Sequence, residues 1–154
     1  MKPQLAITTR TIVLLTFLLV SAGCSKSPPP DIAQNEKKFQ EMMAAATLVG
    51  TSTRLNKEGT FGPERYTIEK VSKISGDTWL FQTRMKFGSH DLPLPLPLTV
   101  KWAGDTPVIT LTDLAIPGVG TFTARVLLYG DQYAGTWSGK SEGGQLFGKI
   151  VHEK

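Results

Sequence analysis

The chain has 154 residues, of which 17 are Lys or Arg, 13 are Asp or Glu, two are His and one is Cys. This length is typical of one domain, and a single Cys excludes an internal disulfide framework and any metal site built from several thiolates of this chain. Charged residues make up 19% and hydrophobic residues 40% of the chain, a balance that excludes a disordered polyelectrolyte.

Residues 1–23 have the three parts of a secretory signal peptide. Lys2 and Arg10 give a basic start without an acid, residues 12–20 form an apolar run interrupted by one Thr, and small residues follow at 21–23. The apolar run is too short for a membrane-spanning helix, which needs about 20 residues. The sequence therefore predicts that the chain is exported and that residues 1–23 are removed.

Cys24 comes directly after this predicted cleavage site. Together with Ala22 and Gly23 it resembles the lipobox of bacterial lipoproteins, although Ser21 stands where that pattern usually has Leu, Val or Ile. The resemblance implies that Cys24 is acylated, with palmitate-type chains that hold the protein at a bilayer. By the same resemblance Ser25, which is not Asp, implies the outer membrane, on its periplasmic or cell-surface face. The alternative is a plain signal peptide and a secreted, unlipidated domain.

The positive charge of the chain belongs partly to this leader. Removal of residues 1–23 takes away Lys2 and Arg10 and leaves 15 basic and 13 acidic residues, a net charge of +2. The chain has no block of five or six Lys or Arg residues. Nucleic acid is therefore not an expected partner.

A short spacer and a helix follow the Cys. Residues 24–30 contain three consecutive prolines, which favour an extended tether. Asp31 is a typical N-cap, and Ile32, Phe39, Met43 and Ala46 recur at helical spacing. We therefore expect a helix over residues 31–46, whose apolar stripe packs on the following domain.

From residue 47 to 154 the hydrophobic period changes to two. Trp79, Phe81 and Thr83 alternate with Leu80 and Gln82, and similar alternation recurs along the chain between Gly- and Asp-containing turns. Short connections between half-buried strands imply antiparallel pairing. We expect a mainly β domain, an up-and-down meander of about eight strands that forms a small barrel or a strongly curled sheet, near residues 47–55, 64–74, 78–88, 94–103, 107–114, 120–129, 132–139 and 145–152.

Three prolines constrain the fourth of these strands. Pro93, Pro95 and Pro97 alternate with leucines, and residues two apart in a strand direct their N–H groups to the same neighbour. All three missing donors therefore fall on one edge of the strand. This predicts an exposed edge or seam in the sheet, while a proline-rich ligand for a partner domain is the less favoured alternative.

No residue pattern in the chain indicates catalysis. His90 and His152 are the only histidines, and neither lies in a nucleophile motif or at the spacing of a zinc site. Gly118 and Gly120 precede an expected strand, whereas a dinucleotide loop precedes a helix. We therefore expect a non-enzymatic protein with no catalytic residues, no metal and no cofactor.

The remaining expectation is a binding or structural role in the envelope. A small apolar ligand in the barrel mouth, or an envelope protein added at the proline-marked edge, are the partners that this fold would suit, besides the membrane itself. The residues that would face such a ligand are large and apolar: Trp79, Phe81, Met85, Trp102, Phe122 and Trp137. Ordinary core filling is the favoured interpretation of these six, because a domain of about 100 residues has little apolar material to spare.

A periplasmic enzyme is the alternative from a different functional class. It would need polar strand residues that converge in space, for which the candidates are Arg65, Glu69, Arg84, Lys101, Asp113 and Arg125. A buried cluster of these residues in a cleft would favour the enzyme over a binding module.

Two resemblances extend these expectations. Gly50 at the first strand and the Gly-Thr-Trp at 135–137 are similar to the short motifs of calycin and avidin-type barrels. Ser52 stands where the first strand of a calycin has Trp. An open curled sheet or a β-sandwich stays the alternative to such a barrel. Residues 102–111 and 135–150 resemble uncharacterised lipoproteins of environmental, planctomycete-like bacteria. That second resemblance implies the compartment and no activity.

Overall fold

The computed structural model describes residues 31–152, which form one helix and eight strands. The helix is α1 (Ile32–Met43), and the strands are β1 (Ala46–Arg54), β2 (Lys57–Ser75), β3 (Thr78–Phe87), β4 (His90–Ala103), β5 (Thr106–Ile116), β6 (Gly120–Tyr129), β7 (Gln132–Ser138) and β8 (Gly143–His152). Each strand pairs antiparallel with the next, and β1 pairs with β8 from Ala46–His152 to Ser52–Leu146, which closes the sheet into a barrel. The expected mainly β meander of eight strands is confirmed.

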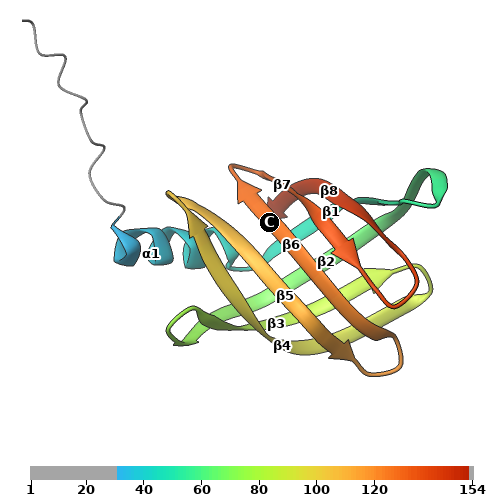
Figure 1. The fold of residues 1–154 in the computed structure, drawn as a ribbon. Coiled ribbons are helices and arrows are strands. Elements are labelled where there is room, and N and C mark those ends of the chain that lie inside the picture. The colour runs from blue at the N-terminus through green and yellow to red at the C-terminus, as the bar shows by residue number, and fades with distance from the viewer. Residues whose placement is uncertain (1–30, 153–154) are drawn as a thin grey trace, which may run out of the picture.

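The helix α1 begins as the sequence predicted and ends earlier. The Asp31 carboxylate accepts a hydrogen bond from the Gln34 backbone N–H at 3.1 Å, which satisfies one free donor of the first turn. The expected end at residue 46 is wrong, because Ala44 is extended, Ala45 has a φ of 52° and Ala46 already belongs to β1. Figure 1 shows α1 at the end of the barrel where β1 starts.

The strand boundaries are confirmed at most turns, and β2 is the main exception. The sequence places its start near residue 64, whereas β2 begins at Lys57 after a two-residue turn. Gly59, Gly62 and Pro63 make residues 57–63 look like a loop, yet this stretch pairs with the end of β1 through irregular register. β4 also begins earlier than expected, at His90, and pairs with β3 along its whole first half.

The proline-marked edge of β4 is confirmed. Pro93, Pro95 and Pro97 lie opposite β3 residues in the ladder between β3 and β4. The ladder between β4 and β5 begins only at Thr99, two residues after Pro97, where the backbone again has an N–H group. It extends over five pairs, from Thr99–Thr110 to Ala103–Thr106. The barrel is closed by the pairing of β1 with β8, yet residues 90–98 of β4 have no ladder on the β5 side.

The core fills the barrel from the end that α1 covers, which we call the helix end. Phe39 inserts there among three aromatic rings, with centroid separations of 5.2 Å to Trp79, 6.1 Å to Phe81 and 6.1 Å to Trp102. The opposite or distal end is formed by the β1–β2, β3–β4, β5–β6 and β7–β8 connections. Several inward-facing residues toward that end are only half-buried, namely Met85, Leu94, Leu114, Phe122 and Trp137, whereas Ile116 is buried.

Replacement of Phe39 tests whether α1 is an integral part of the barrel. We expect Phe39→Ala to lower the free energy of unfolding by about 3–5 kcal/mol, because the ring is 1% exposed and its removal leaves a cavity between aromatic side chains. Ile32→Ala is the matched control, since Ile32 lies on the same helix and is 43% exposed. Urea denaturation measures both, and equal losses would show that the helix does not seal the core.

Candidate functional site

The six predicted ligand-facing residues fall into three different environments. Trp79 and Phe81 are 2% and 1% exposed and belong to the packed core. Trp102 is half-buried at the helix end. Met85, Phe122 and Trp137 are half-buried at the distal end. The structure thus divides the six residues between the packed core and the two barrel ends. Cys24, the predicted lipid attachment site, lies outside the described residues.

A cleft of about 290 Å³ lies at the helix end, between α1 and the turns that join β4 to β5 and β6 to β7. Phe39, Met42, Trp102 and Leu128 give it apolar walls. The other residues that line it are Asn35, Lys38, Asp105, Thr106, Pro107, Tyr129 and Gly130. An apolar hollow with a few polar groups at its margin is typical of a small-molecule site.

Asn35 is the polar group that most needs a partner in this cleft. It is 6% exposed, and among the described residues its side-chain Nδ2 has no hydrogen-bond acceptor. An unsatisfied buried amide is costly, by about 1–3 kcal/mol. Lys38 follows three residues later on α1, so the two side chains lie on neighbouring positions of the helix surface. The cleft therefore has a hydrogen-bond donor and a cation on its helical wall, and Asp105 on its other wall.

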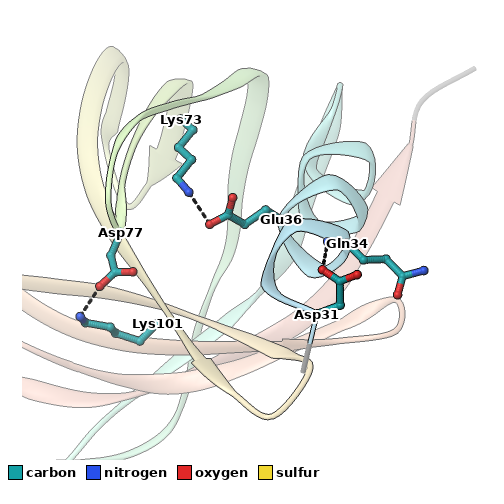
Figure 2. A network of polar contacts seen from close by, with 6 residues as sticks. All are labelled: Asp31, Gln34, Glu36, Lys73, Asp77 and Lys101. Atoms are coloured by element: carbon teal, nitrogen blue, oxygen red, sulfur yellow. Dashed lines mark hydrogen bonds and ion pairs between the residues drawn. The ribbon is translucent and has the colours of Figure 1, made fainter. Parts of the chain in front are cut away.

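Polar contacts hold the elements around this end in place. Glu36 of α1 forms an ion pair with Lys73 near the end of β2, and Asp77 of the β2–β3 turn pairs with Lys101 of β4, as Figure 2 shows. The Gln40 side chain also donates to the backbone carbonyl of Val71 at 3.2 Å. The two ion pairs are exposed, so they position α1 and the neighbouring turns more than they stabilise the fold.

A second polar group lies inside the barrel toward the distal end. The Glu64 carboxylate accepts hydrogen bonds from the Ser52 hydroxyl and from the Tyr66 hydroxyl, both at 2.6 Å and on different oxygens. Glu64 is in phase with Tyr66 and the buried Ile68 on β2, which directs its side chain inward. This cluster is not among the sites predicted from the sequence, although an acid in the apolar phase of a strand is the signal that could have revealed it.

Tyr133 of β7 completes this distal cluster from across the β1–β8 pairing that closes the barrel. Register pairs join Tyr133 to Gly148, Gly148 to Gly50, and Gly50 to Glu64, so the four residues form one row across β7, β8, β1 and β2. Tyr133 is 2% exposed, and its hydroxyl has no partner among the described residues. Burial, reinforced by the negative charge of Glu64, raises the pKa of Tyr133 to about 12, and the same two causes raise the pKa of Tyr66.

The polar strand residues proposed for an enzyme are engaged on separate partners. Arg84 pairs with Asp91 at 2.8 Å, and Lys101 pairs with Asp77. Arg125 donates to the Leu111 carbonyl and, at 2.9 Å, to the Thr112 hydroxyl. The remaining candidates are dispersed over the sheet: Arg65 and Glu69 on β2, and Asp113, which accepts from Thr123, on β5. A convergent cluster of the six is not what the barrel presents.

The two histidines also lie apart. The His90 ring packs on Phe87 with centroids 5.3 Å apart, and His152 Nε2 lies 3.0 Å from the Met42 carbonyl. Within residues 31–152, no three His, Cys, Asp or Glu side chains are close enough to hold a metal ion. No helix in this part of the chain has the length and apolar character needed to cross a bilayer.

Comparisons with protein-family models, with curated proteins and with solved structures found no match to this chain.

Alkaline titration tests the distal cluster. An unfolded chain deprotonates tyrosine near pH 10, while the folded barrel holds Tyr133 neutral until about pH 12. Stability from this group is therefore complete below pH 10 and is lost as the pH rises toward 12, by about 2 kcal/mol. Denaturant unfolding across this range should show the loss, and the Tyr66→Phe, Tyr133→Phe double variant should lack most of it. An identical alkaline loss in the double variant would contradict the assignment.

Proposed function

We propose that this chain is a lipid-anchored lipoprotein of the bacterial envelope, a non-enzymatic module that binds a small ligand. The signal-peptide pattern and Cys24 support the anchor. The cleft at the helix end supports the binding role, and the unpartnered Nδ2 of Asn35, a residue that lines this cleft, is the observation that carries this half of the proposal. The tether of residues 25–30 joins the two parts of the chain.

The chemistry of the cleft selects the class of ligand. Phe39, Met42 and Trp102 offer contact to an apolar body, and Asn35 requires a hydrogen-bond acceptor. Lys38 beside Asn35 favours an acceptor with negative charge, while Asp105 opposite disfavours the reversed orientation. A short acyl chain with a carboxylate head meets all of these requirements, and a cleft of about 290 Å³ limits it to a small molecule.

The anchor is tested by the mass and location of the mature protein. We expect the native chain to fractionate with membranes and to exceed the mass of residues 24–154 by its acyl groups, because several acyl chains together hold a small domain at a bilayer. Cys24→Ser should abolish the added mass, whereas Ser25→Ala, one residue away, should retain it. A native chain with the mass of an unmodified polypeptide would show that the domain is secreted without lipid.

The binding role is tested with octanoate as the probe. We expect octanoate to shift the amide resonances of α1 and of the β4–β5 and β6–β7 turns in the full chain. Asn35→Ala should weaken binding about fivefold, the value of one hydrogen bond of about 1 kcal/mol. Gln34→Ala is the matched control, because Gln34 is the preceding, exposed residue of the same helix.

An absence of octanoate binding by the native chain, or equal weakening by both variants, would contradict a binding role for this cleft. Either result would leave the anchor intact and favour a structural role for the barrel.

A further inference from the structure

The distal cluster has unused hydrogen-bonding capacity on a carboxylate. Ser52 and Tyr66 each occupy one oxygen of Glu64 with a single hydrogen bond at 2.6 Å. A carboxylate offers about four acceptor positions, so each oxygen retains one. The ion pairs among the described residues do not include Glu64. A further donor, best one with positive charge, is the group that this carboxylate can still accept.

Tyr133 provides a second unused polar atom close to the first. Its hydroxyl lies 2.3 Å from the position that a Cβ on Gly50 would occupy, and Gly50 is the register partner of Glu64. The Tyr133 hydroxyl has no partner among the described residues, although the side chain is 2% exposed. Its oxygen can accept a hydrogen bond as well as donate one. The Tyr133 hydroxyl thus lies at Gly50, the position next to Glu64 in the same inward-facing row.

Glu64 is reachable from the distal end. The residue is half-buried, unlike Tyr133, and so are several inward-facing side chains toward that end, although Ile116 is buried. Those side chains are apolar: Met85, Leu94, Leu114 and Phe122. A ligand that enters there meets an apolar rim first and the carboxylate deeper in the barrel.

We propose that the distal end of the barrel is a second binding site, specific for the primary ammonium group of a small alkylamine. An ammonium has three N–H donors, which match in number the two oxygens of Glu64 and the hydroxyl oxygen of Tyr133. Its charge compensates a carboxylate held in an apolar surrounding, which an alcohol cannot do. A carboxylate ligand is repelled there, so this site and the helix-end cleft select opposite charges.

The test uses n-butylammonium as the probe on the full chain, with binding followed by amide resonances of β1, β2 and β7. We expect Glu64→Gln to weaken binding at least tenfold, because the amide keeps the shape of the side chain and removes its charge. Glu69→Gln is the matched control, since Glu69 lies on the same strand and is exposed. Two further probes separate charge from hydrogen bonding: n-butanol lacks the charge, and tetramethylammonium lacks the N–H donors. Both should bind more weakly than n-butylammonium.

Equal affinity of Glu64→Gln and the native chain, equal binding of n-butanol, or shifts confined to the helix end would overturn the proposal. Thermal melting shows whether each variant is folded. Tyr133→Phe retains the carboxylate and removes one acceptor, so it should weaken binding a few-fold. If Glu64→Gln does not fold, Tyr133→Phe becomes the test, and an unchanged affinity of that variant for n-butylammonium would also overturn the proposal.

Discussion

The barrel depends on the close approach of β1 and β8 at Gly50 and Gly148. A Cβ on Gly50 would lie 2.1 Å from the Phe147 carbonyl oxygen, and one on Gly148 would lie 2.2 Å from that of Val49. No side chain fits at such distances, so glycine is required on both strands. The Tyr133 ring covers the space that the two glycines leave, within 2.8 Å of where a Gly148 Cβ would be. The same two glycines therefore allow both the closure of the sheet and the burial of Tyr133.

This closure leaves two ends with different chemistry. At the helix end, Phe39 brings an aromatic ring into contact with Trp79, Phe81 and Trp102, and burial of apolar surface holds α1 in place. At the distal end a carboxylate enters the barrel, which costs free energy unless it is hydrogen-bonded. Ser52 and Tyr66 supply those bonds. The two ends thus differ in chemistry: aromatic rings pack at one, and a hydrogen-bonded carboxylate lies toward the other.

The sequence predicts the strands well because alternation and turn residues are local signals. The β3 pattern from Trp79 to Phe87 and the turn at Gly76 are examples, and both agree with the structure. Closure has no local signal, since Ala46 pairs with His152 across almost the whole domain. The distal cluster was also hidden, because the row from Tyr133 to Glu64 depends on the registers of three separate ladders. Glu64 is the one member of the cluster with a local signal in the sequence, because it is an acid in the apolar phase of its strand.

The prolines of β4 affect both the strand pairing and the burial of side chains toward the distal end. Because Pro93, Pro95 and Pro97 lack the N–H groups that would bond to β5, the ladder between the two strands cannot extend below Thr99. An edge without donors is also a poor template for pairing with another chain. Leu94 and Leu114 lie beyond the last ladder pair and are only half-buried, whereas Leu96 and Leu98, nearer the ladder, are buried. The three residues that limit the pairing thus lie in the distal half of β4, where Leu94 is only half-buried.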